Sequence, residues 1–179
     1  PQLGHRIRWT IILDQTRSAV LSQEVSELLQ KEAIEVVDPT SVGYYSTFFV
    51  VPKKDGGFRP ILNLKPLNHF IVYEKFHMET TQTVLQYLSQ GDWLASIDLK
   101  DAYLHVPILP AHRPYLRFAF QGRVYQFKVL PFGLTSAPRV FTKMLAPVVQ
   151  ELHRLGIQFI PYLDDCLIVA KSREILLSH

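Results

Sequence analysis

The fold is decided by residues 158–170, Gln-Phe-Ile-Pro-Tyr-Leu-Asp-Asp-Cys-Leu-Ile-Val-Ala, together with residues 93–98, Trp-Leu-Ala-Ser-Ile-Asp. Both stretches predict buried strands because their apolar residues are nearly continuous. The first predicts a hairpin with Asp164 and Asp165 at its tip, and the second ends at Asp98. An ionised carboxylate is costly inside an apolar strand unless a charge compensates it. The three acids therefore predict a divalent metal site.

Carboxylate oxygens suit Mg²⁺, which keeps some of its waters and is completed by phosphate oxygens of a substrate. Two such ions about 4 Å apart hold both the attacking and the leaving oxygen of a phosphoryl-transfer reaction. The alternative is that each Asp is an ordinary turn or cap residue, which is the commoner role of an isolated Asp-Asp pair. The metal interpretation depends on several such signals occurring in one order along the chain.

Composition excludes several classes of protein. A length of 179 residues with 47% hydrophobic and 20% charged residues is typical of one globular domain or two small lobes. The net charge of +3 is weak evidence for a polyanionic partner. The single Cys166 excludes an intrachain disulfide and a multi-cysteine zinc site. With no long apolar run and no signal peptide, we expect an intracellular protein without a membrane partner. The sequence does not indicate which oligomeric state the protein adopts.

The expected elements form an α+β pattern in which antiparallel strands dominate. Residues 1–17 predict an extended arm, and the helix after it has Ser18 or Ser22 as its cap. The later elements are a hairpin at 44–64, a helix at 81–88, a strand at 93–99, a turn at 100–103, a hairpin at 115–130 and a final hairpin at 158–170. Between the last two hairpins, Ser136 is expected to cap a long helix that kinks or breaks at Pro147.

The first hairpin is basic. Lys53 and Arg59 stand on opposing strands near the turn Asp55-Gly56-Gly57. A lysine supplies a point charge and an arginine a bidentate fork, so the pair suits a triphosphate. The alternative is a solvated charged turn, which is the commoner role of such a sequence taken alone.

Two further segments can border a nucleotide. The backbone N–H groups of Asp101 and Ala102 follow Asp98, and the ring of Tyr103 can lie under a sugar and clash with a 2′-hydroxyl, the group that distinguishes RNA from DNA precursors. Gly133 allows close backbone approach to a base or sugar. The alternatives are a core aromatic for Tyr103 and an ordinary loop around Gly133.

Basic residues between positions 113 and 143 alternate with aromatic ones and can form a nucleic-acid track. The basic members are Arg113, Arg117, Arg123, Lys128, Arg139 and Lys143. The alternation also allows many of the intervening aromatic residues to be core residues.

Taken in order, four segments resemble the reverse transcriptase domain over about residues 20–172. They are the Lys53/Arg59 hairpin, Asp98-Leu99-Lys100-Asp101-Ala102-Tyr103, Leu130-Pro131-Phe132-Gly133 and Tyr162-Leu163-Asp164-Asp165. The amino-acid sequence of residues 49–57, 112–118 and 138–143 most resembles that of the DIRS-type, tyrosine-recombinase group of retrotransposons.

The resemblance implies an RNA-directed DNA polymerase with the fingers and palm of a right-hand polymerase, the palm being an antiparallel sheet packed on helices. Residues 18–92 would be mainly fingers and residues 93–179 mainly palm, with part of 107–135 returning to the fingers. The chain ends 14 residues past Asp165. We therefore expect a C-terminally truncated domain without a thumb; a further alternative is part of a polyprotein whose missing downstream region carries ribonuclease H.

The resemblance also assigns roles to residues. Asp98, Asp164 and Asp165 would be the catalytic, metal-binding acids for two Mg²⁺ ions, or Mn²⁺, with the Leu99 carbonyl as a further ligand. The other implied contacts are with the incoming dNTP: Lys53 and Arg59 hold its triphosphate, the Asp101 and Ala102 amides support its phosphates, Tyr103 is the sugar gate, and Phe132 and Gly133 border the nucleotide. The implied partners are an RNA or DNA template-primer and dNTP.

Two other functions are compatible with the sequence. A non-catalytic nucleic-acid-binding remnant is suggested by the missing thumb. A two-metal nuclease would use the same acids, but the Lys53/Arg59 hairpin and Tyr103 favour nucleotide capture over hydrolysis.

Overall fold

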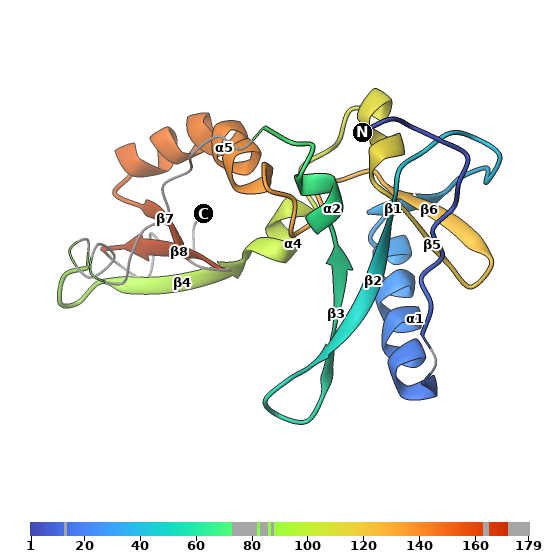
Figure 1. Cartoon of the computed structure of the whole chain (residues 1–179). Coiled ribbons are helices and arrows are strands. Elements are labelled where there is room, and N and C mark those ends of the chain that lie inside the picture. The colour runs from blue at the N-terminus through green and yellow to red at the C-terminus, as the bar shows by residue number, and fades with distance from the viewer. Residues whose placement is uncertain (13, 73–81, 83–85, 87, 163–164, 172–179) are drawn as a thin grey trace. The chain divides into compact units, whose positions relative to one another are not determined.

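The structure, a computed structural model, describes residues 1–12, 14–72, 82, 86, 88–162 and 165–171 (Figure 1). The chain forms two compact units. Unit 1 is Pro1–Val72 with Leu104–Thr135, and unit 2 is Tyr73–Tyr103 with Ser136–His179. Most of the helix predicted at residues 81–88 lies outside the described residues, and so do Leu163 and Asp164. The fold is α+β, as predicted.

Unit 1 contains a five-stranded sheet with the strand order β1-β6-β5-β2-β3. The strands are β1 (Ile34–Val36), β2 (Tyr45–Pro52), β3 (Phe58–Asn63), β5 (Arg117–Phe120) and β6 (Arg123–Phe127). Both predicted hairpins, β2–β3 and β5–β6, are confirmed by their antiparallel registers. The short strand β1 was not predicted, and β2 and β5 run parallel.

Helix α1 (Gln15–Gln30) packs against β2 and β3. It begins after Asp14, whose side chain accepts a hydrogen bond from the Thr16 amide at 2.8 Å. The predicted caps Ser18 and Ser22 are wrong because this carboxylate caps the helix earlier in the chain. Two shorter helices complete unit 1, α2 (Lys65–Asn68) and the 3-10 helix η1 (Pro110–Tyr115).

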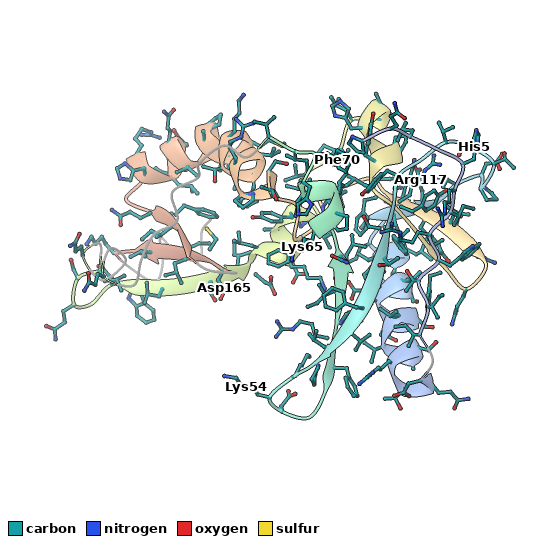
Figure 2. All side chains as sticks on the ribbon, in the orientation of Figure 1. His5, Lys54, Lys65, Phe70, Arg117 and Asp165 are labelled. Carbon is teal, nitrogen blue, oxygen red and sulfur yellow. The ribbon has the colours of Figure 1, made fainter. Side chains whose placement is uncertain are left out.

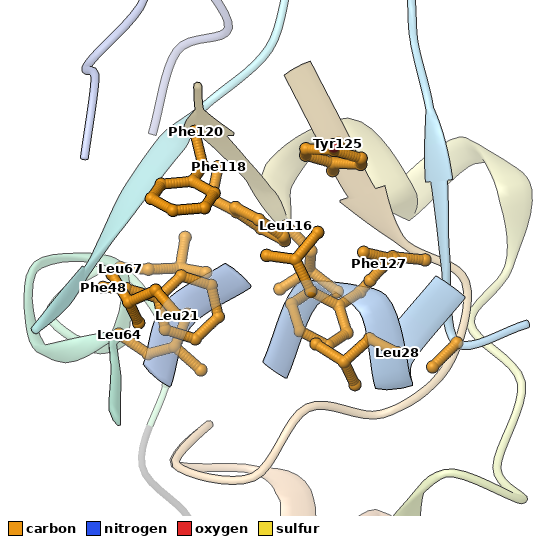
Figure 3. Close-up of a cluster of buried hydrophobic side chains, with 13 residues drawn as sticks. Leu21, Leu28, Phe48, Leu64, Leu67, Leu116, Phe118, Phe120, Tyr125 and Phe127 are labelled. Carbon is orange, nitrogen blue, oxygen red and sulfur yellow. The ribbon is translucent and has the colours of Figure 1, made fainter. Parts of the chain in front are cut away.

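The core of unit 1 lies between α1 and the sheet and is rich in aromatic rings (Figure 3). Phe118 is fully buried at its centre. Its ring lies 4.9 Å from that of Phe48, edge to face, and 5.2 Å from that of Tyr125, stacked. Both geometries are favourable for aromatic pairs. The aromatic residues of β5 and β6 are therefore core residues, as the alternative interpretation expected.

Arg117 is buried in unit 1, with 5% of its surface exposed. Its guanidinium donates to Gln126 Oε1 at 3.1 Å, to Ser41 Oγ at 2.9 Å and to the Ser41 carbonyl at 3.2 Å. Gln126 in turn donates to Glu35 at 2.8 Å. Arg117 therefore stabilises the fold, and its predicted place in a nucleic-acid track is wrong.

Residues 1–12 run along the sheet of unit 1 as an extended arm, with bridges from Gly4 to Gly43 and from Trp9 to Ala119. β2 and β5 pair over only two residues each. Beyond that point Thr10 connects them, because its amide donates to the Ala119 carbonyl at 2.8 Å and its hydroxyl accepts from the Phe48 amide at 3.2 Å. The arm thus supplies hydrogen bonds where β2 and β5 separate.

Unit 2 contains an antiparallel three-stranded sheet, order β4-β8-β7, built from β4 (Trp93–Asp98), β7 (Gln158–Tyr162) and β8 (Asp165–Ala170). The β7–β8 hairpin is as predicted. Burial is confirmed for β8, where Cys166 is fully buried, but is wrong for β4, where Trp93 and Leu94 are 48% and 52% exposed. An apolar run predicts a strand but does not show which face of the sheet other segments cover, so it could not predict this exposure.

The helices of unit 2 that fall entirely within the described residues are α4 (Leu99–Tyr103) and α5 (Ala137–Arg154). The turn predicted at 100–103 is a short helix. Ser136 precedes α5 but its side chain makes no capping hydrogen bond, since its backbone (φ −83°, ψ −7°) is helical rather than extended. The helix continues through Pro147 without a break. None of the helices in the described part of the chain has both the length and the apolar content that a bilayer crossing requires.

Candidate active site

The two described acids lie directly opposite each other in the sheet of unit 2. Asp98 ends β4, Asp165 begins β8, and the two are register partners (Figure 2 labels Asp165). Directly opposed residues of an antiparallel pair point to the same face. Both residues are exposed. Like charges in this position destabilise a sheet, so the pair favours a bound cation.

Asp98 is also oriented by the backbone. Its Oδ1 accepts a hydrogen bond from the Lys100 amide at 2.8 Å, at the start of α4. A carboxylate has about four acceptor positions, so this bond leaves capacity for a metal ion. Hard oxygen donors of this kind match Mg²⁺. Within the described residues no group of three or more His, Cys, Asp or Glu side chains forms a metal site; the third predicted acid, Asp164, is outside them.

Helix α4 carries the other predicted residues of unit 2. Leu99, Asp101 and Ala102 follow Asp98 directly, and Leu99 is 3% exposed. Tyr103 is 1% exposed, and its ring packs at 5.0 Å on that of Phe141 from α5. Tyr103 thus occupies a core position, as the alternative interpretation expected, and its role as a sugar gate stays a prediction.

The predicted phosphate-binding pair belongs to unit 1. Arg59 is paired with Val51, and a 2.7 Å bond from the Lys53 amide to the Gly57 carbonyl extends the pairing toward the turn. Because side chains alternate along a strand, Lys53 lies on the same face as Val51 and therefore as Arg59. Both cationic side chains are exposed. One face of the hairpin therefore presents two positive charges.

The turn of this hairpin is fixed by its own chemistry. Gly56 has a φ of +87°, which few other residues adopt. The Asp55 carboxylate accepts a hydrogen bond from the Gly57 amide at 3.1 Å. Figure 2 labels Lys54, which stands at the tip. The two cations are consequently carried by an ordered hairpin rather than by a loose loop.

The loop at residues 130–135 is held to the end of the β3–α2 segment. Gly133 has a φ of +102°, and a Cβ there would lie 3.8 Å from the Leu64 side chain. Phe132 is 40% exposed. Asn68, the last residue of α2, donates from Nδ2 to the Gly133 carbonyl at 3.0 Å and accepts from the Thr135 amide at 2.8 Å. Sequence reasoning missed Asn68 because its partners are 65 and 67 residues away.

Charge is divided unequally between the units. Unit 1 contains twelve Lys and Arg against seven Asp and Glu, a formal charge of +5, whereas unit 2 contains seven against nine, a formal charge of −2. A basic surface attracts polyanions, and an acidic one attracts cations. The cationic hairpin thus belongs to the unit with a positive net charge, and the opposed carboxylates belong to the unit with a negative net charge.

Residues 51–179 match the family model described as reverse transcriptase (RNA-dependent DNA polymerase). The chain belongs to the reverse transcriptase family. The matched region includes the hairpin residues Lys53 and Arg59 and the opposed acids Asp98 and Asp165. The resemblance of the sequence to this family is therefore confirmed.

Curated relatives are polyproteins of viruses and transposons. The genome polyprotein of Petunia vein clearing virus (isolate Hohn) is 30% identical over 156 residues, covering 85% of this chain and 7% of that protein. The retrovirus-related Pol polyprotein from transposon gypsy of Drosophila melanogaster is 26% identical over 168 residues, covering 90% and 16%. This reverse transcriptase chain thus spans a small part of the relatives it matches.

Solved reverse transcriptase structures share the fold. The prototype foamy virus protease-reverse transcriptase superposes with a TM-score of 0.71 at 21% identity, over 97% of this chain and 22% of that one. A foamy viral protease-reverse transcriptase in complex with double-stranded DNA gives a TM-score of 0.72 at 18% identity, over 98% and 30%. The predicted fold class is confirmed by this similarity.

Proposed function

We propose that this chain is the fingers and palm part of an RNA-directed DNA polymerase, which transfers a nucleotide from dNTP to a primer 3′-hydroxyl. The observation that carries the proposal is the direct opposition of Asp98 and Asp165, inside the region that matches the family. Unit 1, with its cationic hairpin, is assigned to the fingers, and unit 2, with its antiparallel sheet, to the palm. The proposed partners are dNTP and an RNA or DNA template-primer.

The acids of unit 2 are proposed to hold two Mg²⁺ ions, or Mn²⁺. Asp98 and Asp165 are the described ligands, and Asp164 and the Leu99 carbonyl are the further ligands of the proposal. When bound, such ions activate the primer hydroxyl and stabilise the charge on the leaving pyrophosphate. Asp98 contributes a carboxylate whose direction is set by the Lys100 amide, and Asp165 contributes the opposed one.

Nucleotide contacts are proposed for residues of each unit, taken separately. Lys53 and Arg59 neutralise the triphosphate from one face of the hairpin, and Arg59 can bind phosphate oxygens in a bidentate way. The remaining contacts are proposed for the Asp101 and Ala102 amides with the phosphates, and for Phe132 and Gly133 with the base and sugar. The exposure of Phe132 and the positive φ of Gly133 support a close approach at that loop.

Tyr103 is proposed to act as the sugar gate by occupying space rather than by forming a hydrogen bond. Its ring is held against Phe141 in the core of unit 2, so it yields little to a bulkier sugar. The expected consequence is discrimination against a 2′-hydroxyl. A Tyr103→Ala variant should therefore incorporate ribonucleotides more readily relative to deoxynucleotides.

Extension of a labelled primer by one nucleotide on an RNA template, with Mg²⁺, tests the proposal. We expect incorporation by the wild type and by Asp38→Asn, a control in unit 1, but not by Asp98→Asn. Cleavage of an RNA–DNA hybrid that depends on Asp98, without incorporation, would instead identify a nuclease. Binding that weakens with salt but ignores Mg²⁺, without either reaction, would identify a non-catalytic remnant.

We also propose that the chain derives from a DIRS-type, tyrosine-recombinase retrotransposon. The amino-acid sequence of residues 112–118 and 138–143 supports this assignment to a retrotransposon group. The genomic neighbourhood of the coding sequence provides the test. A tyrosine-recombinase reading frame in the same element supports the proposal, and an integrase frame in its place contradicts it.

A further inference from the structure

The carboxamide of Asn68 uses both of its ends on one loop. Its Nδ2 donates to the Gly133 carbonyl at 3.0 Å, and its Oδ1 accepts from the Thr135 amide at 2.8 Å. These two bonds fix the loop on either side of Leu134. Because donor and acceptor are both required, no apolar side chain and no carboxylate can reproduce the pair.

Asn68 is itself held firmly. Its amide donates to the Leu64 carbonyl at 2.8 Å, and its carbonyl accepts from the Ile71 amide at 3.2 Å. The neighbouring Leu67 is 3% exposed and Leu64 is 2% exposed, so α2 is anchored in the core of unit 1. The carboxamide therefore projects from a rigid base.

The same segment leads back to the cationic hairpin. β3 carries Arg59 and continues through Leu64 directly into α2. Asn68 thus connects the strand that carries a proposed triphosphate ligand with the loop that carries Phe132 and Gly133. All of these residues belong to unit 1.

We propose that Asn68 is a positioning residue for the nucleotide site, an inference that rests on the proposed function. By holding Gly133 and Thr135, it orders the Phe132–Gly133 loop before the dNTP arrives. A site ordered in advance binds its ligand without the entropic cost of ordering the loop. Loss of Asn68 therefore weakens dNTP binding more than it slows the chemical step.

Single-turnover extension of a primer by dATP separates these two effects. For Asn68→Ala we expect the apparent Kd for dATP to rise about tenfold, as for the loss of two neutral hydrogen bonds, and the maximum rate to change less than about twofold. The matched control is Asn63→Ala, which removes a side-chain carboxamide from the same segment. The hydrogen bond lost there is local, because Asn63 Oδ1 accepts from the Lys65 backbone amide at 3.3 Å. It should bind dATP like the wild type.

The two hydrogen bonds from the Asn68 side chain to Gly133 and Thr135 form a clamp on the loop. Hydrogen exchange of the Thr135 amide, followed by NMR without ligand, tests this clamp directly. Exchange should accelerate in Asn68→Ala but not in Asn68→Asp, which keeps the acceptor for Thr135 and loses the donor for Gly133. Both variants should bind dATP weakly. Unchanged exchange in a folded Asn68→Ala variant overturns the clamp.

The outcomes separate the two proposals. A wild type that neither extends the primer nor binds dATP in an equilibrium titration overturns the proposed function, and this inference with it. A wild type that binds dATP, with Asn68→Ala binding equally well, overturns the inference alone. A fall in maximum rate at unchanged Kd also contradicts a positioning role in binding.

Discussion

Replacing Gly43 by alanine would place a methyl group against the buried Arg117 side chain. The added Cβ would lie 2.5 Å from Arg117 Cδ, 2.7 Å from Nη1 and 2.9 Å from Nε. Ordinary contacts of a Cβ begin at 3.4 Å. The arginine would have to retreat by about 1 Å, into a core packed nearly as densely as an organic crystal.

The arginine is not free to retreat. Its Nε is bonded to Gln126 and its Nη1 to Ser41. Overpacking a core costs about 1–3 kcal/mol, and losing one hydrogen bond of a charged group costs about 1.5–3 kcal/mol. We therefore expect Gly43→Ala to lower the free energy of unfolding by about 3 kcal/mol.

Urea denaturation measures this loss. With an m-value of about 2 kcal/mol/M, the midpoint should fall by about 1.5 M. Gly4→Ala is the matched control, because Gly4 is the bridge partner of Gly43 and a Cβ there has no neighbour within 4 Å. In an Arg117→Ala background the added methyl group should cost much less. A Gly43→Ala midpoint equal to that of Gly4→Ala would refute the reasoning.

Three further predictions concern other parts of the chain. Thr10→Val removes the acceptor of the buried Phe48 amide and should cost about 1–3 kcal/mol in urea denaturation; a loss below about 0.5 kcal/mol would contradict the role of the arm. The Ser89 amide, and then Lys171, hold the pKa of Asp92 below its ordinary value. The wild type should therefore have a higher free energy of unfolding than Asp92→Asn at pH values above the unfolded pKa of about 3.9. This difference should disappear as the pH falls through the lowered pKa of the folded protein. Urea midpoints at neutral and strongly acid pH check this, and a pH-independent difference would count against it. Burial raises the pKa of Cys166 to about 12, so a thiol reagent should label it only as fast as the protein unfolds, and rapid labelling of the native protein would show that the thiol is accessible.

Local chemistry made the hairpins predictable. The glycine turn after Lys54 and the alternation on either side of Gly122 each specify a reversal of the chain, and both were found. The placement of Asp98 and Asp165 at strand ends was likewise predictable from the apolar runs beside them. Their direct opposition was not, because it depends on the register of β4 against β8.

The failures came from contacts between distant residues. The apolar run of β4 predicts burial, but burial depends on which face of the sheet distant segments cover, and Trp93 and Leu94 are exposed. Arg117 was assigned to a surface track because its partner Ser41 lies 76 residues away. Asn68 gave no signal for the same reason. The prediction of the residue that caps α1 was wrong for a different reason. Aspartate and serine are both common N-cap residues, so the sequence alone does not choose among Asp14, Ser18 and Ser22.

The central claim is that the opposed acids of unit 2 bind a divalent cation, and a Mn²⁺ titration followed by electron paramagnetic resonance tests it most directly. Free Mn²⁺ gives a strong signal that falls when the ion is bound. The claim predicts binding by the wild type and by the Asp38→Asn control, and much weaker binding by Asp98→Asn and Asp165→Asn. Equal Mn²⁺ binding by the wild type and Asp98→Asn, or no binding by the wild type, would contradict it.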